Sequence, residues 1–318
     1  MSASSSSLKL RVQRIEWIAE DVLEIEVRGE TDLPAFTSGS HIDVHLPNGI
    51  SRSYSLVNDP ADRSRYCIGV GMDPKSRGGS RHIHTQLRPG QIIEVDPPLN
   101  NFVLDESAEH TVLIAGGIGI TPIFSHARKL AQLQKEFEVY QAARERSRAA
   151  YCEKLEEISP MYHLHIDDEN QGQFLDIPGI VQQQTPKTHL YCCGPPAMMQ
   201  SFEAAVAEIP ESQVHVEYFV ARSEAEQGQS GDFFLGLARS GREFLVPADR
   251  SALEVLLENG VTISNSCQEG ICGSCETRVL EGTPDHRDSV LSKAEKLSNK
   301  TVMLCVSRCQ GERMVVDL

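Results

Sequence analysis

Residues 267–275 read CQEGICGSC, and a fourth cysteine, Cys305, lies further along the chain in a short apolar run. Within this segment Cys267, Cys272 and Cys275 have C-x4-C-x2-C spacing. Three thiolates on one tight loop and a distant fourth are the ligand pattern of a plant-type 2Fe–2S cluster. The spacing therefore predicts a one-electron carrier in the last quarter of the chain.

Two glycines of this loop support the same interpretation. Gly270 and Gly273 allow the backbone to wrap closely, so that its N–H groups can point at the cluster sulfurs. The alternative is a zinc site, but structural zinc sites commonly combine two CxxC-like units, and only Cys272 and Cys275 form one here. The pattern favours iron–sulfur over zinc.

The composition argues against several classes of protein. With a net charge of -15 and no Lys/Arg cluster, the chain lacks the basic face that nucleic-acid binding needs. It has no run of about 18 apolar residues and no leader segment, so we expect a cytoplasmic protein without a membrane span. The nine cysteines do not form a disulfide framework. Those outside the cluster are expected to be free thiols: Cys67, Cys152, Cys192, Cys193 and Cys309.

The residue pattern divides the chain of 318 residues into several domains. From residue 8 to about residue 104, short alternating runs are separated by Gly, Pro, Asn and Asp, which predicts an antiparallel sheet or barrel. From about residue 109 to residue 221, apolar strands alternate with helical stretches, which predicts a parallel α/β domain of the nucleotide-binding kind. Residues 223–231 read SEAEQGQSG, and we interpret them as a flexible linker before the cysteine-rich domain.

A glycine-rich turn opens the second domain. Residues 111–122 read TVLIAGGIGITP, in which an apolar strand runs into Gly116 and Gly117 and a helix begins near Thr121. Such a turn directs backbone N–H groups toward a pyrophosphate. The match to G-x-G-x-x-G is imperfect, because a proline stands at the third glycine position, and an ordinary tight turn is the alternative. A second strand end follows at residues 190–199, LYCCGPPAMM, and two such ends in one parallel sheet predict a ligand cleft.

Two short motifs of the first domain suit an aromatic ligand that carries a phosphate. Residues 52–55 read RSYS and offer an arginine fork, a flat aromatic face and short hydroxyl groups. Residues 77–80 read RGGS and precede a short helix expected over residues 81–87, so that adjacent glycines and a helix N-terminus form an anion cradle. Each motif alone also fits a plain strand edge or a hairpin turn.

Taken together and in this order, RSYS, RGGS, GGIGITP, CGPPAMM and CQEGICGSC with Cys305 resemble the phthalate dioxygenase reductase family, single-chain reductases that serve Rieske-type oxygenases. The resemblance covers residues 8–318. It implies a multidomain protein with these parts: an FMN-binding antiparallel β-barrel over residues 1–104, an NAD-binding α/β domain with a parallel sheet over residues 105–222, a linker over residues 223–231, and an α+β ferredoxin-like 2Fe–2S domain over residues 232–318.

The resemblance also implies the site residues. FMN is expected to contact Arg52, Ser53, Tyr54, Ser55, Gly69, Val70, Gly78, Gly79 and Ser80. The pyridine nucleotide is expected to contact Gly116, Gly117, Thr121, Cys193, Gly194 and Pro195. Phe219 matches an aromatic residue that lies near the flavin ring where nicotinamide enters, although a plain core phenylalanine is the alternative.

Two choices stay open. Cys309 is a second candidate for the fourth cluster ligand, but MLCVSR resembles the family's last ligand segment, which favours Cys305. In a continuous strand the two thiols would lie about 13 Å apart, so only one can bind. The family leans to NADH, whereas Arg144, Arg146 and Arg148 are able to hold a 2′-phosphate and keep NADPH open.

The expected function is electron transfer. Nicotinamide gives a hydride and a 2Fe–2S cluster takes one electron at a time, so a flavin is needed between them. The expected partner is a separate Rieske-type oxygenase component; a haem monooxygenase or another electron acceptor is the alternative. A redox sensor is a further alternative, but it would need an output domain, and only a short tail and the linker lie outside the three domains.

Overall fold

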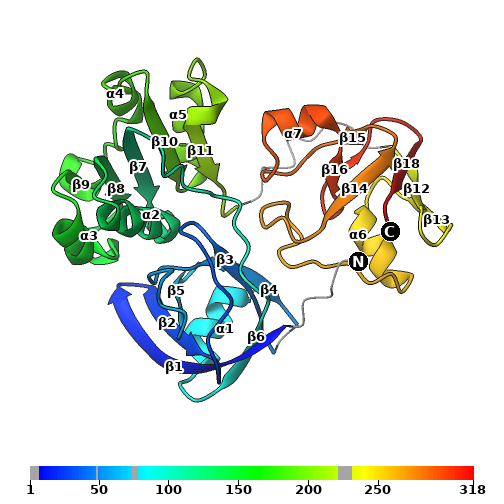
Figure 1. Cartoon of the computed structure of the whole chain (residues 1–318), viewed down its shortest axis with the longest axis horizontal. Coiled ribbons are helices and arrows are strands. Elements are labelled where there is room, and N and C mark those ends of the chain that lie inside the picture. Colours follow the sequence, from blue (N-terminus) through cyan, green and yellow to red (C-terminus); the bar gives the residue numbers. More distant parts are fainter. Residues whose placement is uncertain (1–6, 48, 74–77, 221–230) are drawn as a thin grey trace. The chain divides into compact units, whose positions relative to one another are not determined.

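The structure is a computed structural model that describes residues 7–47, 49–73, 78–220 and 231–318. It divides into two compact units, of which the second begins at Val220 (Figure 1). The first unit contains an antiparallel barrel and a parallel α/β sheet, and the second contains the cysteine-rich domain. The linker predicted over residues 223–231 lies outside the described residues except for Gly231.

The N-terminal part of the first unit is a closed antiparallel sheet. Its elements are β1 (Leu8–Ala19), β2 (Val22–Arg28), β3 (His41–His45), β4 (Ser51–Ser55), β5 (Tyr66–Gly71), α1 (Gly79–Gln86) and β6 (Ile92–Val95). The strand order is β4-β3-β6-β1-β2-β5. An isolated bridge from Leu56, next to β4, to Ile68 of β5 joins the two edges into a barrel. The alternating apolar residues, among them Val12, Ile25 and Ile42, fill its interior, as the sequence predicts.

The second part of the first unit is a five-stranded parallel sheet with helices on both faces (Figure 1). Its strands are β7 (His110–Gly116), β8 (Phe137–Ala143), β9 (Tyr162–Ile166), β10 (Thr188–Cys193) and β11 (Val214–Glu217). Its α-helices are α2 (Ile120–Gln132), α3 (Cys152–Ile158), α4 (Ile177–Gln182) and α5 (Pro196–Ala205), with 3-10 turns η1 (Gly117–Gly119), η2 (Arg146–Arg148), η3 (Asp168–Asn170) and η4 (Glu211–Gln213).

The strand order of this sheet is β11-β10-β7-β8-β9, so the chain reverses its direction across the sheet between β7 and β10. Ligands of open α/β sheets bind at the carboxyl ends of the strands at such a switch point. Successive side chains of β7 point to opposite faces of the sheet, and helices cover both faces. Leu113 packs in one core with α2 and α3, and Val112 packs in another core with α4 and α5.

The second unit is a mixed sheet with its own core. Its elements are β12 (Phe233–Leu237), β13 (Glu243–Val246), α6 (Ala252–Glu258), β14 (Glu276–Glu281), β15 (Pro284–Asp285), α7 (Lys293–Ser298), β16 (Thr301–Met303), β17 (Arg308–Cys309) and β18 (Arg313–Val316). The main sheet has the order β13-β12-β18-β14-β16. A capping box of Ser251 and Glu254 begins α6, which packs Leu253 and Leu256 into the core. An α+β fold is therefore confirmed for this unit.

The segment that contains Cys305 and Cys309 is not one continuous strand. A continuous strand through Cys305 and Cys309 is interrupted, because β16 ends at Met303 and residues 304–306 form a turn. The carbonyl of Met303 accepts hydrogen bonds from the N–H groups of Val306 and Ser307, which replace strand pairing.

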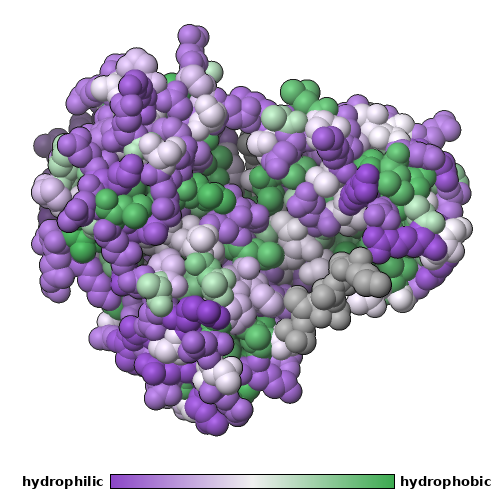
Figure 2. Space-filling view, viewed as in Figure 1, coloured by the Kyte–Doolittle hydropathy of each residue, from purple (hydrophilic) through white to green (hydrophobic). Residues whose placement is uncertain are grey.

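The surface and the helices agree with the composition. Hydrophilic residues cover most of the face in Figure 2, as a net charge of -15 predicts. In the part of the chain that the structure describes, each helix is too short or too polar to cross a membrane.

Candidate functional site

The four cysteines predicted to bind the cluster come from two segments of the second unit. Cys267, Cys272 and Cys275 lie in the loop between α6 and β14, and Cys305 lies in the turn after β16. All four are buried, and none is more than 7% exposed. Four sheltered sulfur donors are the ligand set that a 2Fe–2S cluster requires.

These cysteines contact one another in two pairs. A hydrogen bond with Cys272, together with burial, raises the pKa of Cys267. A hydrogen bond from Cys305 lowers the pKa of Cys275 and raises that of Cys305. Two cysteines for each of two irons is the requirement of a binuclear cluster.

Cys309 lies in a different environment from the four paired cysteines. It belongs to β17, and its Sγ donates to the carbonyl of Arg313 at 3.3 Å. The same sulfur accepts a hydrogen bond from the N–H of Gly311 at 3.4 Å. These contacts support Cys305 as the fourth ligand, a choice that stays a prediction.

The cysteine loop presents backbone N–H groups to its sulfurs. The N–H of Glu269 donates to Sγ of Cys267 at 3.3 Å, and the N–H of Gly270 donates to the sulfur of Cys305. Gly270 and Gly273 have φ of 70° and 79°, which side chains disfavour. The glycines therefore permit the wrapped conformation that the sequence predicts, and such N–H groups stabilise charge on cluster sulfurs.

In the barrel, β4 and the start of α1 bring the two flavin motifs together. A Cβ on Gly79 would lie 2.8 Å from Cγ of Arg52, so the arginine runs across the first turn of the helix. Gly78 precedes α1 with φ 110°, and within the described residues no side-chain cap bonds to the first turn of this helix. An arginine beside an uncapped helix N-terminus suits a phosphate group. Arg77 lies outside the described residues.

The hydroxyl groups of β4 differ in how they are bonded. Ser53 donates to Oδ1 of Asp43, whereas the buried Oγ of Ser55 has no hydrogen-bond partner within the described ranges. A buried orphan hydroxyl is the feature expected where a polar ligand atom belongs. Burial raises the pKa of Tyr54, so its phenol stays protonated. These residues fit a flavin.

A glycine contact joins the flavin strand to the nucleotide helix. Gly69 and Val70 lie on β5, and a Cβ on Gly69 would lie 2.5 Å from Cγ2 of Thr121 and 3.0 Å from the Tyr151 hydroxyl. Thr121 belongs to the first turn of α2. The structure therefore brings together residues that the sequence assigned to two different cofactors.

The two strand ends predicted to share an edge lie against each other. A Cβ on Gly119 would lie 2.2 Å from the carbonyl oxygen of Cys193, and one on Gly116 would lie 2.6 Å from Cδ of Pro195. A Cβ on Gly194 would lie 2.5 Å from the sulfur of Met198 in α5. At Gly119 the close atoms are backbone, so the loops after β7 and β10 leave no room for a side chain there.

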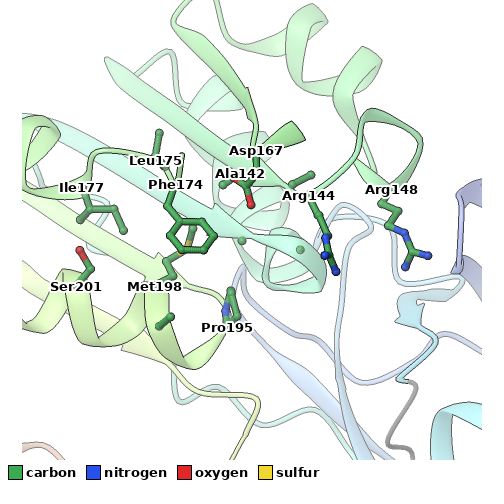
Figure 3. A pocket seen from close by; sticks show the side chains of 14 residues that line it. Ala142, Arg144, Arg148, Asp167, Phe174, Leu175, Ile177, Pro195, Met198 and Ser201 are labelled. Atoms are coloured by element: carbon green, nitrogen blue, oxygen red, sulfur yellow. The ribbon is translucent and has the colours of Figure 1, made fainter. Parts of the chain in front are cut away.

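Beside these loops lies a cavity of about 370 Å³ (Figure 3). Its lining residues are Gly116, Gly117, Ala142, Ala143, Arg144, Arg148, Asp167, Phe174, Leu175, Ile177, Pro195, Ala197, Met198 and Ser201. Figure 3 shows Leu175 and Ile177 on one side and the guanidinium groups of Arg144 and Arg148 on the other. An apolar slot beside cations suits a nucleotide.

Two domain models match the chain. One, described as oxidoreductase NAD-binding domain, matches residues 113–204, and the other, described as 2Fe-2S iron-sulfur cluster binding domain, matches residues 236–310. Tetrachlorobenzoquinone reductase from Sphingobium chlorophenolicum is 46% identical, with 100% of both chains covered. Phthalate dioxygenase reductase from Burkholderia cepacia is 37% identical over 98% of this chain and 97% of its own. The chain belongs to the phthalate dioxygenase reductase family.

Solved structures agree with membership of this family. The match to the solved structure of phthalate dioxygenase reductase covers 98% of this chain and 98% of that chain, with 37% identity and a TM-score of 0.72. An intact type IV self-sufficient cytochrome P450 monooxygenase matches 98% of this chain with 36% identity and a TM-score of 0.90, and this chain spans 41% of that longer protein. The protein is thus an oxidoreductase with an NAD-binding domain and a 2Fe–2S domain.

The structure of this reductase also reveals a residue that the sequence did not indicate. Glu217 ends β11 and pairs in register with Cys193 of β10. Its Oε2 is buried without a hydrogen-bond partner in the described parts of the chain, and burial raises its pKa to about 8. A neutral carboxyl at the carboxyl edge of the sheet can donate a hydrogen bond to a ligand. A lone glutamate in HVEYFVA carries no sequence signal of burial.

Phe219 lies close along the chain to Glu217. It is partly buried and packs against the core that contains Val57 and Phe102 from the N-terminal part and Ile120 from α2. This position suits both a packing role and a place at the junction of the barrel and the parallel sheet. Its role beside the flavin stays a prediction.

Proposed function

We propose that this reductase passes electrons from NADH, through FMN in the barrel and the 2Fe–2S cluster, to a separate Rieske-type oxygenase component. One observation supports an oxygenase partner most directly: a relative named phenoxybenzoate dioxygenase subunit beta, from Ectopseudomonas oleovorans, is 44% identical over 100% of this chain and 99% of its own. Flavin, when bound, exchanges a hydride with nicotinamide and single electrons with an iron–sulfur cluster.

Each group of site residues is proposed to bind one part of a cofactor. Arg52 and the first turn of α1 hold the FMN phosphate, and Ser55 with the strand around Gly69 holds the ring system. The turn at residues 116–119 and the facing loop at residues 193–195 hold the pyrophosphate and the nicotinamide half of the coenzyme. The glycine contacts support this arrangement, because they bring the loops after β7 and β10 against each other at the carboxyl edge of the sheet, where ligands of such sheets bind.

The cavity supports NADH as the coenzyme rather than NADPH. Asp167 follows β9 directly and lines the cavity (Figure 3). Its buried Oδ1 accepts no hydrogen bond from the described residues, and Nε2 of His165 lies 3.5 Å away. A carboxylate accepts a hydrogen bond from a ribose 2′-hydroxyl and repels a 2′-phosphate. Asp167→Ser should lower kcat/KM for NADH about tenfold, the value of one charged hydrogen bond, and raise it for NADPH.

The experiment that tests the partner follows reduction of a Rieske centre. Purified Rieske-type oxygenase is mixed anaerobically with NADH and catalytic amounts of the reductase, and bleaching of the Rieske spectrum is recorded. The proposal expects rapid bleaching with the parent and none with Cys275→Ala, because the one-electron route passes through the cluster. Rieske centres that stay oxidised while a haem monooxygenase is reduced would overturn it.

A second acceptor class is supported by the relative named tetrachlorobenzoquinone reductase. A quinone accepts two electrons, so direct reduction at the flavin needs no cluster. Quinone reduction that persists in Cys275→Ala, together with no transfer from the parent reductase to the Rieske protein, would favour this function. Transfer to the Rieske protein that depends on Cys275 favours the oxygenase role.

A further inference from the structure

The arginines that follow β8 form ion pairs that the sequence does not indicate. Arg144 and Arg148 line the coenzyme cavity, and Arg146 lies between them on η2. Three arginines near a nucleotide ribose would ordinarily attract a 2′-phosphate. The structure instead joins two of them to acidic residues that are distant in sequence.

Arg146 forms a two-pronged ion pair with Glu169. Its Nε lies 2.8 Å from Oε1 and its Nη2 lies 2.7 Å from Oε2 of this glutamate. Glu169 belongs to η3, which follows the end of β9. The hydrogen bond from Arg146 lowers the pKa of Glu169, so the carboxylate stays charged. The planar fork of the guanidinium is thereby occupied.

Arg148 is held by the turn between β1 and β2 of the barrel. Its Nη1 lies 2.9 Å from Oδ2 of Asp21, and its Nη2 lies 3.6 Å from Oε1 of Glu20. Ser147 strengthens the attachment, since its Oγ donates to Oε2 of Glu20 at 2.7 Å and its carbonyl accepts from the Glu20 N–H at 2.8 Å. The turn itself is fixed by a hydrogen bond from the N–H of Met72 to the carbonyl of Asp21 at 2.7 Å.

We propose that Glu20, Asp21 and Glu169 determine coenzyme specificity by holding Arg146 and Arg148 in ion pairs that a 2′-phosphate would have to break. They are positioning residues, because they act through the arginines and not on the coenzyme. The inference rests on the proposed function, since it assumes that the cavity holds the adenosine ribose. It gives two of the three arginines at this edge a role that favours NADH over NADPH.

The test compares coenzymes in neutral variants of the acids. Glu169→Gln, Glu20→Gln/Asp21→Asn and the triple variant are assayed for NADH- and NADPH-driven ferricyanide reduction. The matched control is Glu109→Gln, which removes another exposed ion pair of the same domain, with Lys187 at 2.7 Å. In the triple variant, kcat/KM for NADPH should rise about tenfold, the value of one charge-assisted hydrogen bond, while the NADH value changes less than about twofold. Added salt should reduce the gain.

A double-mutant comparison shows whether the acids act through an arginine. The gain of Glu169→Gln should vanish when Arg146→Gln is also present, because no guanidinium is then released. A gain that persists would mean simple repulsion by the carboxylate and would overturn the inference. Thermal midpoints and flavin absorbance confirm that each variant is folded; the Arg146–Glu169 pair is exposed, so its loss costs little stability.

The experiments distinguish failure of the ion-pair inference from failure of the cavity assignment. If Asp167→Ser alters the preference for NADH but the triple variant matches Glu109→Gln, the further inference is wrong and the assignment of the cavity stands. If neither Asp167→Ser nor the triple variant changes the ratio of kcat/KM for NADH and NADPH, the cavity does not bind the adenosine ribose. The cavity assignment and the further inference are then both wrong.

Discussion

The buried carboxyl of Glu217 makes the stability of the first unit depend on pH. Its folded pKa is about 8, against an ordinary value of 4.5, because burial disfavours the charged form. The folded state therefore binds the proton more tightly than the unfolded state between these values, and the free energy of unfolding falls as pH rises through this window. With these two pKa values, the loss between pH 6 and pH 8 is about 2 kcal/mol.

Glu217→Gln removes this loss, because a neutral amide of the same shape has no proton to release. In urea titrations followed by flavin fluorescence, the free energy of unfolding of this variant relative to the parent should be about 2 kcal/mol higher at pH 8 than at pH 6. Glu208→Gln, an exposed glutamate of the same domain, is the control and should track the parent. A difference between parent and Glu217→Gln that is the same at both pH values would refute a buried, protonated carboxyl.

Three further outcomes are expected at the cofactor sites. Arg52→Ala should weaken FMN binding by roughly 1.5 to 3 kcal/mol through the lost phosphate pair; flavin titration measures this, and unchanged affinity would remove Arg52 from the phosphate site. Cys275→Ala should abolish the cluster spectrum but keep flavin content and NADH-driven ferricyanide reduction; loss of flavin would contradict separate domains. Cys305→Ser should lose or distort the 2Fe–2S absorbance while Cys309→Ser keeps it, and the opposite pattern would reassign the fourth ligand.

Local patterns predicted most of the architecture. Alternation over residues 8–104 is the pattern of a barrel, and β1 shows it, since Leu10 and Val12 point into the core while Arg11 is exposed. The parallel sheet follows from apolar strands separated by helical stretches. The break at Met303 was not predictable in the same way, because the apolar run VMLCV fits a strand, and only the tertiary structure turns the chain there.

The site could be predicted wherever its chemistry is local in sequence. The cysteine spacing and the glycine turns are of this kind. The ion pairs of Arg146 and Arg148 are not, because the arginines lie together in sequence, whereas their partners Glu20, Asp21 and Glu169 lie on other elements. An ion pair between distant residues leaves no pattern in a single sequence, and neither does the burial of Glu217.

We expect hydride transfer and one-electron transfer to depend on different parts of this protein. In the first unit, a Cβ on Gly69 would lie 2.5 Å from Cγ2 of Thr121, so β5 packs closely against the first turn of α2. The cluster cysteines belong to a second unit, whose core is built from its own residues, including Leu235, Leu253 and Met314. A change at a cluster cysteine leaves the first core intact, because no member of that core is lost. Loss of one-electron delivery with retained flavin reduction is therefore the result that this division of the chain requires.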